Sequence, residues 1–357
     1  MPKHLKSCTG MLDKITLFQN QRNWNTIRSG VLSLLEQDHS QGTAQGGSLT
    51  RRLEQTLAER FQRRYCVTTG SCSDALTMAV LCLDLPANST IAVSNYTFTA
   101  TAHAVARAGH RVVPVDVDRN YCINVDQIPD CSAVMAVDIF GNMSDWNRLN
   151  QLAVPVICDA AQSFESQRQA WSAQQGLISC VSFSPSKTIS SWGSGGALLT
   201  DDADIAEQAR KLRLHGKLNN NQVSIHPGMN SMISSFEAAC VLVGLEYADA
   251  WQQRRQQIAE YLAGVSKYPC AIDFSLDQHT YHKLVFQSTA RSAVIDQFKS
   301  AGVDCVVHYS TLINDEPLYH SNTAMTVSDQ LKHTSFTVPN QHTLTDEEVE
   351  QIGNLLK

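Results

Sequence analysis

Apolar residues recur along most of this chain in short runs, and stretches of helical period lie between them. Strands are expected at residues 65–69, 90–94, 112–117, 133–139, 154–158, 178–183 and 197–200. Helices are expected around them at residues 49–61, 73–83, 100–108, 145–152 and 203–214. The strands lack a polar face, which is typical of a mainly parallel sheet that helices cover on both sides. The pattern therefore predicts an α/β fold with a mainly parallel sheet of seven-stranded type.

The pattern differs at the two ends of the chain. Residues 1–46 form a polar lead-in with one amphipathic segment at 24–35, and a long helical stretch covers residues 231–262. After it come fewer strands, at 283–287 and 305–308, together with helices at 292–300 and 346–356. A chain of 357 residues is too long for one ordinary core. We expect a lead-in segment (1–46), a large α/β domain (47–248) and a small C-terminal α+β domain (249–357).

Composition limits the partners of the protein. A net charge of −6 and the lack of a basic run argue against a nucleic acid or a membrane as partner. No stretch approaches the roughly 20 apolar residues that span a bilayer, and the N-terminus lacks an apolar signal core. The 11 cysteines form no C-x-x-C pair, and His279 and His282 have no acidic or thiol partner in register. We expect a soluble cytoplasmic protein with buried, reduced cysteines and no metal.

The strongest chemical signal is a lysine and an aspartate at the ends of successive strands. Asp159 ends the strand in Val156-Ile157-Cys158-Asp159, and Lys187 follows the next strand in Ser182-Phe183-Ser184-Pro185-Ser186-Lys187. This pair suits pyridoxal 5'-phosphate, because the amine can form a Schiff base with the aldehyde and the carboxylate can keep the pyridine nitrogen protonated. The alternative is a solvated loop lysine and an aspartate that caps a helix.

Other polar and aromatic residues lie at strand ends of the same sheet edge, where ligands bind in open α/β sheets. Gly70-Ser71-Cys72-Ser73-Asp74 opens a helix with Ser73 as the expected N-cap, so it resembles a phosphate cradle or an ordinary cap. Phe98 could stack on a flat heterocycle or simply pack. Gln162 could donate a hydrogen bond to a ring oxygen or cap a helix, and Ser182 could bind a phosphate or be solvated.

Taken together and in this order, these motifs resemble one family. The chain is similar, from about residue 25 to its end, to the DegT/DnrJ/EryC1/StrS sugar aminotransferases, which have the fold-type-I architecture of pyridoxal-phosphate enzymes. The matching motifs are Leu53-Glu54, Thr97-Phe98, Gly109, Asp116-Val117-Asp118, Phe140-Gly141, Asp159-Ala160-Ala161-Gln162, Ser182-Phe183, Lys187, Gly195-Gly196, His215-Gly216, Gly228-Met229-Asn230, Ala238-Ala239, Gly302, His308-Tyr309 and Thr345-Asp346-Glu347-Glu348.

The resemblance implies a role for each matching residue around the cofactor ring. Lys187 would hold the cofactor aldehyde as a Schiff base and later carry protons between the substrate carbon and the cofactor. Asp159 would face the pyridine nitrogen, Gln162 the ring oxygen and Phe98 the ring face. Lys187 and Asp159 are therefore the expected catalytic residues.

The same resemblance implies a phosphate site and a shared subunit interface. Ser73, the backbone at Cys72, and Ser182 would hold the cofactor phosphate. Asn230 would reach across the interface of a homodimer to the phosphate of the other subunit. His308 and Tyr309 are the expected substrate-binding residues.

The chain departs from the family pattern at three places. Cys72-Ser73 stands where Gly-Thr is usual, and Ser194 replaces the acid of Gly-Glu-Gly-Gly. Asn230-Ser231-Met232 replaces Asn-Tyr-Arg, and a methionine cannot pair with a carboxylate as a guanidinium does. Ser73 keeps the hydroxyl, so the cofactor site is whole, whereas the recognition of the amino donor and the acceptor is altered.

Three functions follow from these observations. The first is transfer of an amino group from an amino acid, with glutamate as the expected donor, to a keto-sugar that is nucleotide-linked. The second is other cofactor chemistry on a sugar or cyclitol, such as dehydration, against which Lys187 weighs because dehydrating relatives lack this lysine. The third is a non-catalytic cofactor-binding sensor or partner protein, which Met232 favours. A nicotinamide dehydrogenase is disfavoured because no G-x-G-x-x-G follows the first strand.

Overall fold

The computed structural model describes residues 14–38, 47–164, 172–217, 223–224, 227–274, 279–321 and 323–357. Within these ranges no helix combines the length and the apolar character that a bilayer-crossing segment needs. Four short 3-10 helices supplement the main elements, at Val125–Gln127, Ile139–Gly141, Ser172–Gln174 and Ile313–Asp315.

A seven-stranded sheet forms the centre of the larger part of the molecule. Its strands lie in the order β1-β7-β6-β5-β4-β2-β3. Their bounds are β1 Tyr65–Thr69, β2 Thr90–Ser94, β3 Arg111–Val115, β4 Ala133–Val137, β5 Val156–Asp159, β6 Ile178–Ser182 and β7 Gly196–Thr200. β7 is antiparallel to both of its neighbours, and all other pairs are parallel. The predicted mainly parallel sheet is confirmed.

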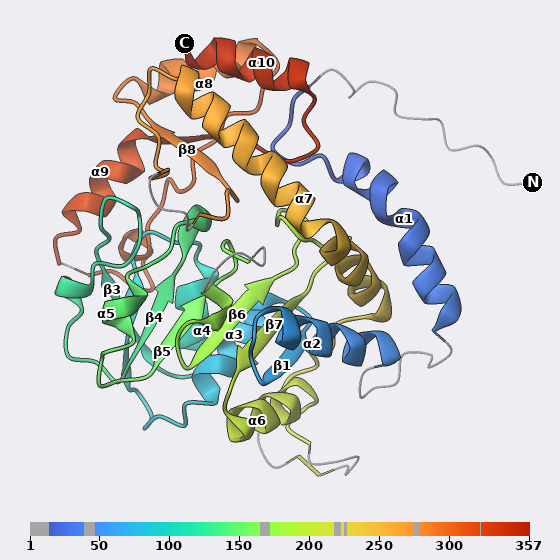
Figure 1. Ribbon diagram of the computed structural model, residues 1–357. Coiled ribbons are helices and arrows are strands. Elements are labelled where there is room, and N and C mark those ends of the chain that lie inside the picture. Colours follow the sequence, from blue (N-terminus) through green and yellow to red (C-terminus); the bar gives the residue numbers. More distant parts are fainter. Residues whose placement is uncertain are drawn as a thin grey trace, which may run out of the picture.

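Helices cover both faces of this sheet (Figure 1). α3 (Cys72–Leu81), α4 (Ala100–Arg107) and α6 (Ala203–Arg213) pack on one face. α2 (Ser48–Arg60), α5 (Trp146–Leu149) and α7 (Ser235–Val265) pack on the other, and α1 (Asn20–Gln37) lies against α7. Neighbouring strand residues such as Cys66 and Val67 belong to opposite cores, because successive side chains of a strand point to opposite faces.

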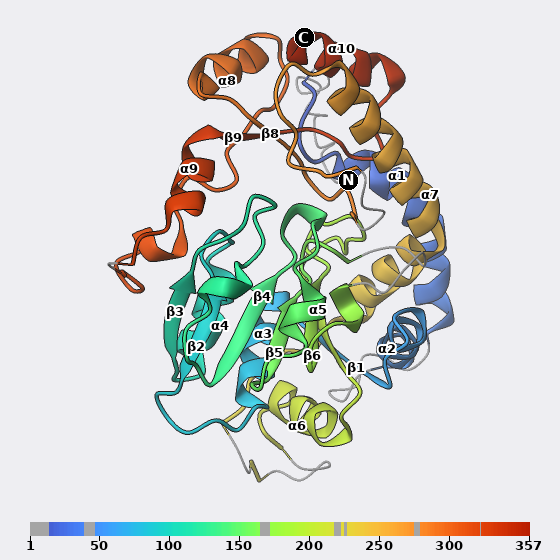
Figure 2. The same cartoon turned by 60° about the vertical axis from the view of Figure 1, so that its left-hand side comes forward.

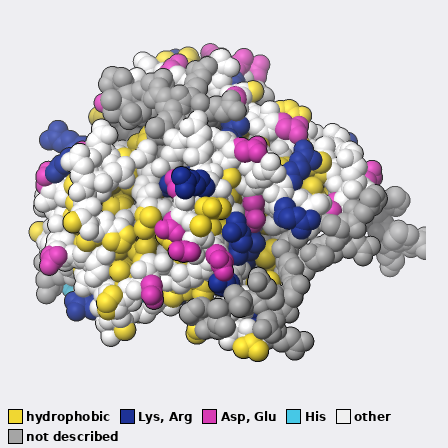
Figure 3. All heavy atoms as spheres, turned by 60° about the horizontal axis from the view of Figure 1, so that its bottom comes forward, with side chains coloured by type: hydrophobic (Ala, Val, Ile, Leu, Met, Phe, Trp, Pro, Cys, Tyr) yellow, Lys and Arg dark blue, Asp and Glu magenta, His cyan; other side chains and the backbone are white. Residues whose placement is uncertain are grey.

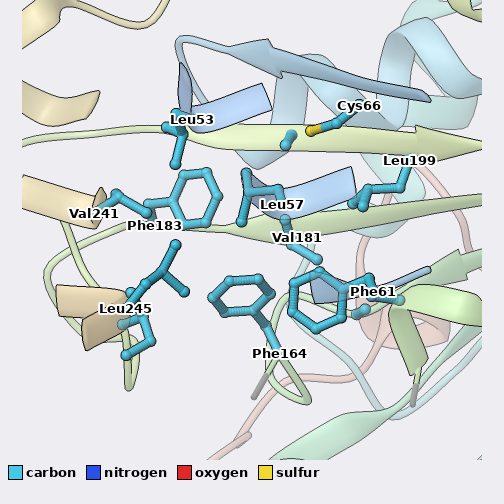
Figure 4. Close-up of a cluster of buried hydrophobic side chains, with 14 of the residues drawn as sticks. Leu53, Leu57, Phe61, Cys66, Phe164, Val181, Phe183, Leu199, Val241 and Leu245 are labelled. Atoms are coloured by element: carbon cyan, nitrogen blue, oxygen red, sulfur yellow. The ribbon is translucent and has the colours of Figure 1, made fainter. Parts of the chain in front are cut away.

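The core on the α2 and α7 side is filled by large apolar side chains (Figure 4). Leu53 and Leu57 from α2 meet Val181 and Leu199 from the sheet. Three rings join this cluster, since Phe164 lies 5.0 Å from Phe61 and 5.4 Å from Phe183 between ring centroids. Because Phe183 directly follows β6, this packing fixes the start of the turn that carries Lys187.

The C-terminal part has its own small sheet and core (Figure 2). β8 (Leu284–Gln287) pairs antiparallel with β9 (Ser335–Val338), and α8 (Arg291–Ser300), α9 (Thr326–Thr334) and α10 (Asp346–Leu356) lie around them. α10 begins with a capping box, in which the Thr345 hydroxyl accepts from the Glu348 N–H (3.2 Å) and the Glu348 carboxylate accepts from the Thr345 N–H (2.9 Å).

Two predictions about this part of the chain need comment. The strand expected at residues 305–308 is wrong, because only Val306 bridges to Thr337 there, and the second strand of this sheet is the unpredicted β9. The predicted domain boundary between residues 248 and 249 falls inside the continuous helix α7, and it stays a prediction.

The surface carries charges of both signs. On the face shown in Figure 3, basic and acidic side chains are interspersed, with apolar atoms between them. Ion pairs such as Arg60–Asp249 (3.0 Å) and Arg148–Asp126 join opposite charges at the surface.

Candidate active site

The predicted site residues lie at one edge of the seven-stranded sheet. Gly196, at the start of β7, is in register with Thr69 at the end of β1 and with Ser182 at the end of β6. Asp159 ends β5 and pairs with Cys180 of β6. The carboxyl ends of β1, β5 and β6 therefore meet here, and the loops that follow them carry the candidate residues.

Asp159 is buried at this edge, with 4% of its surface exposed. Its carboxylate accepts hydrogen bonds from the Thr101 hydroxyl (2.8 Å) and from the Ala161 N–H (3.1 Å). Burial raises the pKa of this carboxyl above its ordinary value, and the two hydrogen bonds and the charge of Lys187 oppose that rise. A cationic ring nitrogen beside it would favour the ionised form further.

Lys187 lies in the turn after β6. Its N–H donates to the Ser184 carbonyl (2.9 Å), and the turn closes where the Ser191 N–H donates to the Phe183 carbonyl (2.8 Å). Burial lowers the pKa of the Lys187 amine below its ordinary value, while Cys72 and Asp159 act in the opposite direction. The amine is therefore close enough to Asp159 for their charges to interact, and desolvation favours the neutral form that a nucleophilic amine needs.

The first turn of α3 faces the same edge. Ser71, and not the expected Ser73, is the N-cap, because its hydroxyl accepts from the Asp74 N–H (3.2 Å). The Ala75 N–H donates to the Ser71 carbonyl (3.1 Å), so the N–H groups of Cys72 and Ser73 precede the first hydrogen bond within the helix. These two N–H groups and the positive end of the helix dipole suit an anion.

Gly196 lets β7 approach this turn closely. A Cβ atom at Gly196 would lie 2.5 Å from the Cys72 nitrogen and 2.7 Å from the Cys72 Cα. Ser182, in register with Gly196, is 5% exposed, and its hydroxyl lies 3.4 Å from the Ser184 nitrogen. The predicted phosphate-binding residues Cys72, Ser73 and Ser182 thus come from the ends of β1 and β6, which lie on either side of β7.

Tyr309 joins the C-terminal part to this edge. Its hydroxyl accepts a hydrogen bond from the Gln162 Nε2 (3.1 Å), while the Gln162 Oε1 accepts from the Phe140 N–H (3.1 Å). The ring of Phe98 lies 6.2 Å from that of Tyr309 and is 55% exposed, so most of one aromatic surface is open for stacking. Gln162 keeps one amide hydrogen for a further acceptor.

The other two predicted residues lie further out. His308 is half-buried, its Nδ1 lies 3.0 Å from the Thr337 hydroxyl, and burial lowers its pKa to about 3. Asn230 is exposed, and its backbone bridges to Leu214. Its neighbour Ser231 donates to the Asp74 carboxylate (2.7 Å) and accepts from the Gly70 N–H (3.0 Å), which places Asn230 one residue from the α3 turn.

Three residues of the site escaped the sequence reasoning. Thr101, which donates to Asp159, follows Phe98 by three residues and gave no signal of its own. The N-cap Ser71 was one of two serines in a short polar run, and either could cap. Lys283 directly precedes the apolar run of β8, and a lysine at such a position was the signal that could have identified it; the structure leaves it 7% exposed.

The donor set fits pyridoxal phosphate, although the structure contains no ligand. A desolvated amine, a buried carboxylate, an open aromatic ring and a helix N-terminus with two available N–H groups lie around one edge of the sheet. The amine suits the cofactor aldehyde, the carboxylate the pyridine nitrogen and the N–H groups the phosphate. Fold and site together suit the class of pyridoxal-phosphate enzymes.

Comparison with known proteins gives the family. Residues 27–357 match the model of the DegT/DnrJ/EryC1/StrS aminotransferase family, so the chain belongs to this family. It is 30% identical over 279 residues to UDP-2-acetamido-2-deoxy-3-oxo-D-glucuronate aminotransferase from Pseudomonas aeruginosa, covering 74% of this chain and 77% of that protein. The resemblance stated from the sequence motifs is confirmed.

Solved structures share the fold. A DegT DnrJ EryC1 StrS aminotransferase from Brucella abortus superposes with a TM-score of 0.86 at 23% identity, covering 95% of this chain and 96% of that chain. NtdA from Bacillus subtilis, solved with bound cofactor PMP, gives a TM-score of 0.87 at 22% identity over 98% of this chain and 85% of that chain. The predicted fold class is confirmed.

Proposed function

We propose that this aminotransferase moves an amino group from an amino acid, with glutamate as the expected donor, to the ketone of a nucleotide-linked sugar. The observation that carries the proposal is the desolvated Lys187 amine, which interacts with the buried Asp159 at the sheet edge. The relative from Pseudomonas aeruginosa, named as acting on a UDP-linked 3-oxo sugar, supports the acceptor class.

The residues divide the work between binding and proton transfer. Asp159 would hold the pyridine nitrogen, Phe98 the ring face and Gln162 the ring oxygen. Bound pyridoxal phosphate would supply an electron sink for negative charge at the substrate carbon. The Lys187 amine, whose pKa burial lowers in favour of the neutral form, would take a proton from that carbon and return it.

The anion site at α3 would fix the cofactor phosphate. The N–H groups of Cys72 and Ser73 and the hydroxyls of Ser73 and Ser182 are the proposed donors. Asn230 would contribute to the phosphate site of a second subunit, and its exposed position one residue from the α3 turn supports this assignment. We therefore expect a homodimer with shared active sites.

The cysteines support a reducing compartment. All cysteines in the described ranges are free, and most of them are buried. Proteins of oxidising compartments generally pair such residues, so we assign this enzyme to the cytoplasm.

Spectroscopy with the purified protein and added pyridoxal phosphate tests the function. We expect visible absorption from the bound cofactor, its loss on addition of L-glutamate, and the release of one equivalent of 2-oxoglutarate per site. Lys187→Ala should abolish both the absorption change and the release of product. Lys299→Ala, at an exposed position of α8, is the matched control and should behave as the wild type.

Two results would contradict this function. Unchanged absorption with every amino acid tried would favour a cofactor-binding sensor, for which Met232 in place of the family arginine is the supporting feature. A protein that takes up no pyridoxal phosphate would remove the assignment of the cofactor site.

A further inference from the structure

A second group of titratable residues lines a pocket beside Lys187. The pocket lies between the turn after β6, the helix α7, the start of β8 and residues 340–343. Its charged and titratable lining residues are Lys187, Arg255, His282, Lys283 and His342. Within the described part of the chain no aspartate or glutamate lines it, so all of its titratable lining groups are basic.

Lys283 is the most unusual member of this group. It is 7% exposed, and its ammonium lies over the ring of Phe18 at 4.4 Å from the ring centroid. Among the described residues no ion pair joins this ammonium to an acid. Burial lowers its pKa well below the ordinary value, and the charges of Lys187 and Arg255 lower it further. A buried amine beside the positive charge of Arg255, with no acidic partner among the described residues, is costly because burial removes much of its hydration.

His282 gives a second, independent observation. It is 4% exposed, and its Nε2 has no hydrogen-bond partner among the described atoms. Burial, followed by the charge of Lys283, lowers its pKa well below the ordinary value. A buried ring nitrogen without a partner, in the lining of the same pocket, indicates that a polar ligand completes the site.

We propose that this pocket is a carboxylate subsite, in which Lys283 with Arg255 and His282 binds an acidic group of the substrate whose reacting carbon lies at Lys187. The proposal rests on the proposed aminotransferase function and adds the recognition element for its substrates. A carboxylate can accept hydrogen bonds from several donors at once and would place a negative charge beside the Lys283 ammonium.

The position of the pocket explains why a substrate carboxylate, and not the cofactor, would occupy it. The N–H groups suited to the cofactor phosphate belong to the first turn of α3, whereas the lysines and histidines here belong to other elements. An amino acid that reacts at Lys187 carries a carboxylate one bond from its reacting carbon. Lys283 would thus supply a cation that the chain lacks at Met232, where relatives usually have arginine.

The carboxylate has two possible sources, and both would use the same cations. The first is the amino donor, and the second is an acidic acceptor, such as a sugar with a carboxylate at its sixth carbon. The name of the Pseudomonas aeruginosa relative contains such a sugar, a glucuronate.

A first experiment measures binding without turnover. Glutarate, a dicarboxylate with neither amine nor ketone, is titrated by calorimetry into the protein saturated with pyridoxal phosphate. Lys283→Met should weaken binding at least about tenfold, the size expected for one charge-assisted hydrogen bond. Lys283→Arg keeps the positive charge and should stay within about threefold of the wild type, while Lys299→Met is the surface control and should be unchanged.

A second experiment separates the two sources. One arm follows the reaction with L-glutamate at increasing concentration. The other arm uses protein treated with L-glutamate and then freed of it, and compares a UDP-linked 3-oxo-glucuronate with the corresponding 3-oxo-glucose. A Lys283→Met defect in the first arm assigns the donor carboxylate. A defect confined to the glucuronate in the second arm assigns the acceptor.

Thermal unfolding distinguishes recognition from a structural role. Because Lys283 is a buried amine with no acidic partner among the described residues, Lys283→Met should unfold at the same temperature as the wild type or higher, although it binds glutarate less tightly. The proposal is wrong if Lys283→Met binds glutarate and reacts in both arms like the wild type, or if Lys283→Arg loses as much as Lys283→Met. Failure of the proposed function alone would look different: glutarate binding would still depend on Lys283, but no amino acid would react.

Discussion

Replacing Gly196 by alanine tests whether the close approach of β7 to α3 shapes the phosphate site. The added Cβ would lie 2.5 Å from the Cys72 nitrogen and 2.7 Å from the Ser71 carbonyl carbon, where ordinary contacts begin at 3.4 Å. The strand and the helix must therefore separate by 3.4 − 2.5, about 0.9 Å. Both clashing groups are backbone, so no side-chain rotation can relieve the contact.

This displacement has two measurable costs. Overpacking of this kind lowers the free energy of unfolding by about 1–3 kcal/mol. It also moves the Cys72 and Ser73 N–H groups away from a bound phosphate, and the loss of one charge-assisted hydrogen bond would raise the Kd for pyridoxal phosphate about 10- to 150-fold. Urea unfolding measures the first cost, and titration of the ligand-free protein with pyridoxal phosphate measures the second.

Gly264→Ala is the matched control. Gly264 lies near the end of α7, and no atom comes within 4 Å of the position its Cβ would take. Alanine there should stabilise the helix by roughly 0.5 kcal/mol and leave cofactor binding unchanged. If Gly196→Ala kept both the stability and the cofactor affinity of the wild type, the argument for a cradle shaped by this approach would be refuted.

Two further predictions concern stability. Arg213 donates a hydrogen bond to the Glu54 carboxylate, so Arg213→Met leaves this carboxylate without its cation and should lower the free energy of unfolding in urea by about 3–5 kcal/mol. The double variant Arg213→Met, Glu54→Met should recover most of that loss. An Arg213→Met variant as stable as the wild type would contradict this. Burial lowers the pKa of His342 in the folded protein to about 2, from an ordinary value of 6.5. Between these two pH values only the unfolded state protonates His342, so stability falls as the pH drops below about 6.5. His342 should contribute about 2 kcal/mol of this loss by pH 5.0. The free energy of unfolding of His342→Phe should therefore decline less steeply between pH 7.5 and 5.0. Equal slopes for the variant and the wild type would show that the protonation of His342 does not differ between the folded and unfolded states.

The large sheet could be predicted from the sequence because its strands are buried on both faces. Such strands consist of unbroken apolar runs with helical segments between them, and this pattern depends on local residues alone. The antiparallel direction of β7 could not be read in this way, since a strand buried on both faces looks the same in either direction. In the C-terminal part, β9 follows α9 without a turn residue between Thr334 and Ser335, so no residue type marks the boundary there.

The candidate site was predictable where a residue sits at the end of a strand. Asp159, Ser182 and Lys187 follow apolar runs, and the rule that strand ends meet at one edge brings them together. The contacts of Tyr309 with Gln162 and Phe98 join segments about 147 and 211 residues apart in the chain, and no local pattern specifies such pairs. For the same reason the position of Lys283 in one pocket with Lys187 could not be predicted from the sequence.

The electrostatics of the site now favour a particular kind of ligand. On one side the α3 turn offers N–H groups for an anion, and on the other side Lys283 and Arg255 form a region of buried positive charge. Asp159 is the buried acid between strand ends, and burial raises its pKa, so a cationic group beside it would stabilise the ionised form. A ligand with a phosphate at one end, a protonated ring nitrogen and a carboxylate at the other would satisfy all three. Pyridoxal phosphate together with an acidic substrate has this distribution of charge.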